Sequence, residues 1–295
     1  MKGHERGALS LTWSDYTLRL DQRTHIMGIL NVTPDSFSDG GRYFKRDLAV
    51  EHGLAMAAEG ADILDVGGES TRPYAERVSV QEELDRVIPV VKGLSKALKI
   101  PISIDTLKAD VAEEALKAGA SIINDISALR FDSRMVSVAA KAGVPVILMH
   151  MKGTPSNMQD NPVYNHLIPE IEDFLTRAMD RAVEGGVDKS RIILDPGIGF
   201  GKTFDHNLEI IRDLHQFLSL GRPILLGTSR KAFLGKLLDK SALERDTGTM
   251  ATIAAGVMHG ASIVRVHNVK MALETIKVID AIRNVDRSHV SEKGG

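Results

Sequence analysis

The stretch PISIDTLKADVAEEALKAGASIINDIS, residues 101–127, contains one complete repeat of the pattern that decides the fold. Its two apolar, β-branched ends predict strands, and the segment between them has apolar residues at three- and four-residue spacing, which is typical of a helix. Gly119 stands just before the second strand, where a residue with left-handed backbone ends a helix and allows a tight turn. The stretch therefore predicts two parallel strands joined by a helix.

This pattern recurs along the whole chain. Eight short apolar runs alternate with longer amphipathic segments, and most runs are apolar throughout, as strands buried on both faces are. We expect a closed (β/α)8 barrel, with a doubly wound open sheet as the alternative. The predicted strands are 25–32, 61–68, 101–106, 121–127, 145–150, 191–197, 223–229 and 262–268, and the glycines that precede strands are Gly60, Gly119, Gly143, Gly186, Gly221 and Gly260.

The remaining segments predict a single domain with two extensions. Residues 1–24 are expected to form an N-terminal extension with a hairpin at 11–21 that covers the barrel floor, and residues 25–285 the barrel itself. We expect 286–295 to be a flexible tail. Pro89 interrupts a helical segment and predicts a kink or a break there.

Composition excludes several classes of function. The 295 residues carry 37 Lys and Arg against 39 Asp and Glu, with no basic stripe, so no nucleic-acid or membrane partner is expected. The chain has no cysteine, which excludes disulfides, thiolate metal sites and a cysteine nucleophile. Neither a signal peptide nor an apolar run of membrane-spanning length is present, so we expect a cytoplasmic protein.

The sequence partly resembles two nucleotide-binding motifs but matches neither. In DPGIGFGKT, residues 195–203, Pro196 stands where the first glycine of a phosphate loop belongs. The dinucleotide pattern G-x-G-x-x-G also fails there, because Lys202 follows Gly201. The sequence contains no H-E-x-x-H motif and no pair of histidines at helical spacing. We therefore expect no zinc site that is held by protein ligands alone.

Polar residues cluster where the predicted strands end. Any one of them could begin a loop or cap a helix, but the carboxyl ends of barrel strands meet at one rim, so together they predict a shared site. They are Asn31, Glu69, Asp105, Asn124, His150, Asp195, Ser229, Arg230, Lys231, Arg265 and His267. Two glycine-rich loops, 33–44 and 67–79, lie at the same rim; they are either plain turns or, as we expect, lids that close over an anionic substrate.

Several of these segments together resemble the motifs of the dihydropteroate synthase family, in the same order. They are MGILNVTPDSFSDGG (27–41), DVGGESTRP (65–73), SIDT (103–106), INDIS (123–127), LMHMKGTPSNMQ (148–159), DPGIGFGKT (195–203), GTSRKAFLG (227–235) and RVHNV (265–269). The resemblance implies a barrel enzyme, usually a homodimer, that joins 6-hydroxymethyl-7,8-dihydropterin diphosphate to para-aminobenzoate in folate synthesis. It also implies Mg²⁺ bound to the diphosphate that is released.

The resemblance also implies roles for individual residues. Asp195 would accept hydrogen bonds from the pterin amino group and ring N–H, Lys231 would reach the pterin carbonyl, and Arg265 would lie along the ring. The implied pterin set is Asp105, Asn124, Met149, Asp195, Phe200, Lys231 and Arg265, and the implied catalytic set is Asp105, Lys231 and Asn31. Asp105 would stabilise the positive charge that develops at the reacting carbon.

The anionic parts of the substrates have their own implied residues. The diphosphate set is Asn31, Thr71, Arg72, Arg265 and His267, and Asn31 would be the protein's oxygen ligand to Mg²⁺. The para-aminobenzoate set is Phe37, Pro73, Lys231 and Ala232. Sulfonamides would compete with para-aminobenzoate near Phe37, Pro73 and Lys231.

The sequence also departs from the family at four positions. Ala232 replaces a common serine, which predicts weaker para-aminobenzoate binding, although backbone N–H groups at a helix start could still bind that anion. Tyr74, Arg77 and Asn268 replace glycine, proline and aspartate, and the first two bear on the shape of the second lid. Two alternatives stay open: a corrinoid-linked methyltransferase, which would share Asp105, Asn124 and Asp195, and a pterin-binding paralogue without catalytic activity.

Overall fold

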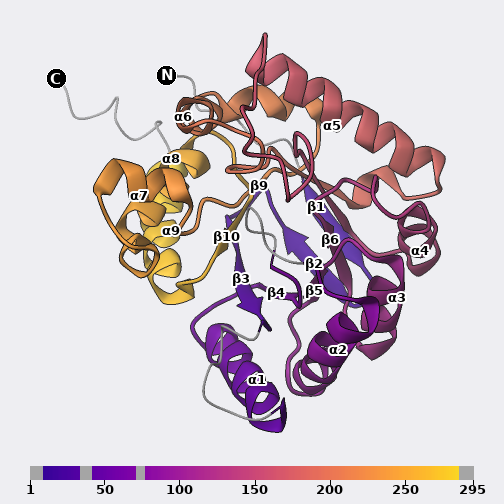
Figure 1. Cartoon of the computed structure of the whole chain (residues 1–295). Coiled ribbons are helices and arrows are strands. Elements are labelled where there is room, and N and C mark those ends of the chain that lie inside the picture. The colour runs from indigo at the N-terminus through magenta and orange to yellow at the C-terminus, as the bar shows by residue number, and fades with distance from the viewer. Residues whose placement is uncertain (1–8, 34–41, 71–76, 286–295) are drawn as a thin grey trace, which may run out of the picture.

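A computed structural model describes residues 9–33, 42–70 and 77–285, with the backbone alone for 42–45. Eight parallel strands form a barrel in the centre, surrounded by helices (Figure 1). The strands are β3 (His25–Asn31), β4 (Ile63–Gly67), β5 (Ile102–Asp105), β6 (Ile122–Asp125), β7 (Val146–Met149), β8 (Ile192–Asp195), β9 (Leu225–Leu226) and β10 (Ile263–Val266).

The strands pair in the order β8-β7-β6-β5-β4-β3-β10-β9. A parallel bridge between Leu194 of β8 and Ile224, just before β9, joins the two ends of this order. The ring is therefore closed, which confirms the barrel and makes the open-sheet alternative wrong. Closure places the carboxyl ends of all eight strands around one mouth.

The helices that surround the barrel follow the strands in turn (Figure 1). They are α1 (Arg42–Ala58), α2 (Val80–Ala97), α3 (Ala109–Ala118), α4 (Met135–Ala142), α5 (Leu167–Glu184), α6 (Phe204–Arg212), α7 (Ala232–Leu238), α8 (Asp246–Met258) and α9 (Val269–Arg283), with short 3-10 turns η2 (Lys189–Arg191), η3 (Leu214–Leu220) and η4 (Ala242–Glu244). No helix in the described ranges is long and apolar enough to cross a membrane.

The helix α2 continues through Pro89, so of the predicted kink or break, a break does not occur. Val87 precedes the proline, Val90 and Leu94 follow it, and all three are fully buried. Because apolar side chains on both sides of the proline pack into the core, tertiary packing keeps the helix in one piece despite the hydrogen bond that proline cannot donate.

The predicted N-terminal hairpin is present as β1 (Ser10–Trp13) and β2 (Tyr16–Arg19), which pair antiparallel. Leu11 and Trp13 are buried, and β1 contacts η2, the turn that leads into β8. Since η2 lies at the amino end of a barrel strand, the hairpin covers the floor opposite the mouth. The predicted tail, 286–295, lies outside the described residues.

The six glycines predicted to precede strands all have positive φ, as expected. Two of them differ in their surroundings. A Cβ added to Gly119, with φ +114°, would lie 2.5 Å from Cβ of Ser95, whereas one added to Gly221, with φ +66°, would meet nothing within 4 Å. Backbone conformation alone thus requires glycine at residue 221, and backbone conformation together with close packing requires it at residue 119.

Alanine substitution at these two glycines should separate the two causes. We expect Gly221→Ala to lower the free energy of unfolding by about 1 kcal/mol, the cost of left-handed backbone for a residue with a Cβ. Gly119→Ala should cost at least about 1 kcal/mol more, because Ser95 must also move. Urea unfolding measures both values, and equal losses would contradict the packing argument.

Candidate functional site

Charged side chains from several strands meet inside the barrel mouth around Arg265 of β10. Its Nε donates to Oδ2 of Asp65 at 2.6 Å, and its Nη2 donates to Oδ2 of Asp105 at 2.7 Å. Nδ2 of Asn124, at the end of β6, donates to the same oxygen of Asp65 at 3.0 Å. The structure therefore brings together three of the predicted residues, Asp105, Asn124 and Arg265, and adds Asp65 as their common partner.

Sequence reasoning missed Asp65. It is the third residue of β4, and it is fully buried in a run that is otherwise apolar. A carboxylate in the middle of a strand buried on both faces requires a partner, and that anomaly was the signal that could have identified it.

Burial and pairing set the protonation of this group. Burial raises the pKa of Asp105, and the neighbouring guanidinium of Arg265 opposes that rise. Burial lowers the pKa of Arg265, but Asp65 and Asp105 more than offset this, so its pKa lies above the ordinary value. Arg265 is therefore a fixed, charged group whose plane is oriented by two carboxylates.

A second group at the mouth consists of Asp195, Lys231 and Phe200. Asp195 ends β8, and its Oδ1 accepts a hydrogen bond from the backbone N–H of Gly197 at 2.7 Å. Burial raises its pKa to about 6. Nζ of Lys231 lies 4.1 Å from the ring centroid of Phe200, and burial together with Arg265 lowers its pKa to about 8. At pH 7 the carboxylate and the ammonium are thus both mainly in their charged forms.

An apolar wall adjoins these charged groups. Phe200 and Met149, both predicted for the pterin set, pack in one buried cluster separate from the main core, and Ile126, Met151 and Met158 complete it. A flat apolar surface beside oriented charges suits a planar heterocycle with polar edges.

His267 is held at the end of β10 by Ser229. The hydroxyl of Ser229 accepts from the backbone N–H of His267 at 3.1 Å and lies 2.8 Å from its Nδ1. If the hydroxyl donates its own proton to Nδ1, the proton of the neutral imidazole is on Nε2. Burial lowers the pKa of His267 to about 3, with Arg230 and Arg265 adding to this, so the ring is neutral at pH 7.

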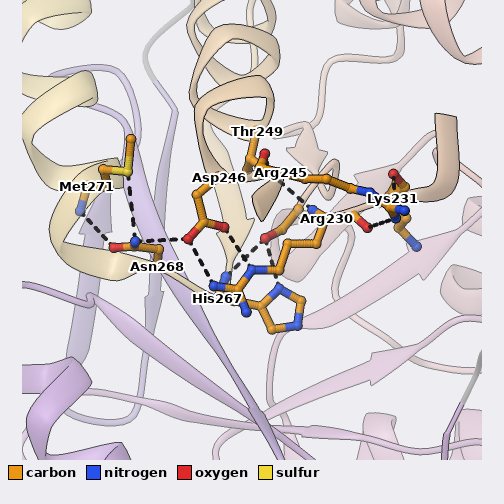
Figure 2. A network of polar contacts seen from close by, with 9 residues as sticks. Arg230, Lys231, Arg245, Asp246, Thr249, His267, Asn268 and Met271 are labelled. Atoms are coloured by element: carbon orange, nitrogen blue, oxygen red, sulfur yellow. Dashed lines mark hydrogen bonds and ion pairs between the residues drawn. The ribbon is translucent and has the colours of Figure 1, made fainter. Parts of the chain in front are cut away.

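The turn that carries Lys231 is fixed by ion pairing (Figure 2). Arg230, with φ +57°, binds both carboxylate oxygens of Asp246 at 2.7 and 2.9 Å. Asn268 accepts from the backbone N–H of Met271 at the start of α9 and donates to Asp246 at 3.0 Å. An aspartate at residue 268 would face the Asp246 carboxylate, so asparagine suits this chain. Ala232, the first residue of α7, is exposed.

Asn31 and His267 line one cavity of about 580 Å³ between the ends of β3 and β10 and the helix α1. The remaining residues that line it are Ile29, Leu48, Glu51, His52 and Ala55. Within the described ranges no three His, Asp or Glu side chains are close enough to hold a metal ion. The amide oxygen of Asn31 would suit a metal ion that is bound mainly by a phosphate ligand.

Some predicted residues cannot be placed. Phe37, Thr71, Arg72, Pro73 and Tyr74 lie outside the described residues, as do residues 34–41 of the first predicted lid and 71–76 of the second. Two rim residues have structural partners: Glu69 binds Lys108, and His150 is buried against Lys202. Arg77 is exposed.

Comparison with known proteins agrees with this geometry. A family model described as "Pterin binding enzyme" matches residues 27–267. A dihydropteroate synthase of Bacillus subtilis is 50% identical over 272 residues, which cover 92% of this chain and 93% of the relative.

Solved structures agree as well. The dihydropteroate synthase of Yersinia pestis in complex with a sulfonamide drug superposes with a TM-score of 0.89 at 44% identity, covering 94% of this chain and all of that one. The enzyme of Xanthomonas albilineans in complex with 7,8-dihydropteroate superposes with a TM-score of 0.84 at 40% identity, covering 92% and 98%.

Removal of the Asp65 charge should destabilise the protein, because Arg265 would lose one of its two buried partners. We expect Asp65→Asn to lower the free energy of unfolding by about 3 kcal/mol, the usual cost of breaking a buried ion pair. The matched control is Asp110→Asn, which breaks a bidentate pair with Arg134 on the exposed surface and should leave the thermal midpoint nearly unchanged. Thermal unfolding compares the two variants, and similar shifts would show that the buried pair has no special weight.

Proposed function

The chain belongs to the dihydropteroate synthase family of pterin-binding enzymes, and we propose that it joins 6-hydroxymethyl-7,8-dihydropterin diphosphate to para-aminobenzoate, giving 7,8-dihydropteroate and diphosphate in folate biosynthesis. The convergence of Asp105, Asn124, Asp195, Lys231 and Arg265 on one mouth, beside an apolar wall, supports this proposal. A pterin has such a shape: a flat ring with donors and acceptors along one edge.

We assign each of these side chains a contact with the pterin. Asp195 accepts from the amino group and the ring N–H, and Lys231 donates to the ring carbonyl. Arg265 lies along the ring face, where Asp65 and Asp105 hold its guanidinium plane. Phe200 and Met149 cover apolar parts of the ring.

The cavity beside Asn31 and His267 is proposed to take the diphosphate. His267 would donate through Nε2, and the Asn31 oxygen would help to hold Mg²⁺ on the diphosphate. Thr71 and Arg72 are proposed to close on the diphosphate from the second lid. Mg²⁺, when bound, neutralises charge on the leaving diphosphate.

The reaction is substitution at the carbon outside the pterin ring. The bond from this carbon to the diphosphate oxygen breaks, the electron-rich ring spreads the positive charge, and Asp105 stabilises it from nearby. The neutral amine of para-aminobenzoate forms the new C–N bond and then loses a proton. Water would capture the same cation, so exclusion of water by the two lids favours the synthetic route.

Phe37, Pro73, Lys231 and Ala232 are proposed to bind para-aminobenzoate, and sulfonamides to compete there. The assembly is proposed to be a homodimer in the cytoplasm. Exposed apolar side chains on α7, α8 and α9 support an interface on that side: Leu237, Leu238, Met258, Val278 and Ile282.

The direct test is diphosphate release by the purified protein. We expect release only when both substrates and Mg²⁺ are present, because the lids exclude water and leave the amine of para-aminobenzoate as the nucleophile that captures the cation. Tight pterin binding without turnover would instead favour the paralogue that lacks catalytic activity, and methyl transfer from a methylated pterin to a corrinoid would favour the methyltransferase.

Pterin affinity should depend on the ionisation of Asp195. Its pKa lies near 6, so the carboxylate is mainly charged at pH 7 and mainly protonated at pH 5. Because only the charged form accepts two hydrogen bonds, we expect 6-hydroxymethylpterin to bind about tenfold more weakly at pH 5 than at pH 7. Calorimetric titration measures this. Asp195→Asn should bind weakly at both pH values, and an unchanged pH dependence in that variant would assign the effect to another group.

Restoring the serine common in the family should affect the second substrate alone. We expect Ala232→Ser to lower the KM for para-aminobenzoate several-fold, since a hydroxyl adds a hydrogen bond to the carboxylate at the exposed start of α7. Pterin affinity should not change. Steady-state kinetics with each substrate varied in turn provides both values, and an unaltered KM for para-aminobenzoate would remove residue 232 from that site.

A further inference from the structure

Lys202 is the lysine that makes DPGIGFGKT similar to a phosphate loop, yet it points into the protein. It is 3% exposed. Its Nζ lies 2.8 Å from Nδ1 of His150, 3.0 Å from the carbonyl oxygen of Phe200 and 3.5 Å from the carbonyl oxygen of His150. A phosphate-binding lysine presents its ammonium to the ligand, whereas this one is used inside the fold.

The loop around it, residues 196–201, has an unusual backbone. Gly197, Gly199 and Gly201 have φ values of +72°, +80° and +65°, so every second residue is left-handed. A Cβ on Gly197 would lie 1.9 Å from the carbonyl oxygen of His150, which shows that the loop rests directly on the end of β7. Such a backbone cannot form a regular ladder of hydrogen bonds, so side chains must satisfy it.

Side chains from neighbouring elements form hydrogen bonds with the backbone groups of these glycines. Asn207 accepts from the N–H of Gly199 at 2.6 Å, Gln159 donates to the carbonyl of Gly199 at 2.6 Å, and Tyr164 donates to the carbonyl of Gly201 at 2.7 Å. The carbonyl of Phe200, between the two glycines, accepts from Lys202.

We propose that the buried contact between Lys202 and His150 is a positioning element of the pterin site. It fixes the carbonyl of Phe200 against the end of β7, and thereby sets the direction of the Phe200 ring and the distance from Asp195 to the apolar wall. This inference rests on the proposed pterin-binding function. It adds Lys202 and His150 as residues that act on the pterin through Phe200.

The proton arrangement follows from the contacts. Burial lowers the pKa of Lys202 well below its ordinary value, and Asp195 opposes that change. Its Nζ faces one imidazole nitrogen and two carbonyl oxygens, all of which can accept a hydrogen bond. With Lys202 as the donor, we expect Nδ1 of His150 to carry no proton and the imidazole proton to be on Nε2. Burial lowers the pKa of His150 well below the ordinary value, with Lys202 adding to this, which keeps the imidazole neutral.

The first experiment uses Lys202→Met, which keeps the length of the side chain and removes the ammonium. Hydrogen exchange of residues 196–201, measured without substrate, should become at least about tenfold faster than in the parent protein. The matched control is Lys108→Met, which removes another partly buried ammonium, bound to Glu69 and Glu83, and should leave exchange in this loop unchanged. Equal exchange in the Lys202→Met variant and the parent would overturn the proposal.

Kinetics then separates positioning from general structural damage. We expect Lys202→Met to raise the KM for the pterin diphosphate at least about tenfold and to leave the KM for para-aminobenzoate within about twofold. His150→Gln, which retains an acceptor for Lys202, should restore part of the affinity that His150→Leu loses. Equal increases in both KM values would contradict a role specific to the pterin wall.

A spectroscopic test needs no variant and no substrate. In the ¹⁵N NMR spectrum of the parent protein, Nδ1 of His150 should have the chemical shift of an unprotonated nitrogen between pH 6 and 8. A protonated Nδ1 would overturn the contact with the ammonium. Because this measurement and hydrogen exchange do not depend on turnover, they also distinguish failure of this inference from failure of the proposed function.

Discussion

The ion pairs that hold Arg265 between Asp65 and Asp105 are the interaction on which the rest of the mouth depends. Burying an ion is costly unless a partner of opposite charge and well-directed hydrogen bonds accompany it. Both carboxylates face the same guanidinium, so Arg265 joins β4, β5 and β10 at the mouth. Removal of Arg265 would leave two carboxylates without their ion pair, and removal of either carboxylate would leave Arg265 with one partner.

Closure of the barrel makes this arrangement possible. Asp65 and Arg265 are 200 residues apart in the sequence, and only one strand, β3, separates β4 from β10 in the ring. A long guanidinium side chain that points inward from β10 can therefore reach β4 and β5 across the interior. In an open sheet that broke between β3 and β10, the same side chains would lie at opposite edges.

Much of this could be predicted because the signals are local. The alternation of apolar runs and helices, the glycines with positive φ and the polar residues at strand ends each depend on a few neighbouring residues. Asp65 was missed because its partner lies at the other end of the chain, and the local pattern placed it inside a strand. Lys202 was considered only as part of a phosphate-loop motif, since nothing near it in the sequence shows that its side chain contacts His150. The prediction at Pro89 was a kink or a break, and the helix does not break there because core packing outweighed a local preference.

The two sides of the mouth differ in the charge of their side chains. On the pterin side, ionised groups are fixed by partners, so they can direct hydrogen bonds without moving. On the side of the cavity, Asn31 and His267 offer neutral groups, since burial holds the pKa of His267 near 3. Arg265, which the resemblance assigns to both the pterin and the diphosphate, already pairs with two carboxylates. Among the described residues, nothing else in that cavity supplies a full positive charge, because its remaining lining is apolar apart from Glu51 and His52. A diphosphate bound there would meet no full positive charge from the described residues. This gives the proposed Mg²⁺, together with Arg72 of the proposed second lid, a physical reason: Asn31 and His267 would orient the leaving group, and the two cations would neutralise it.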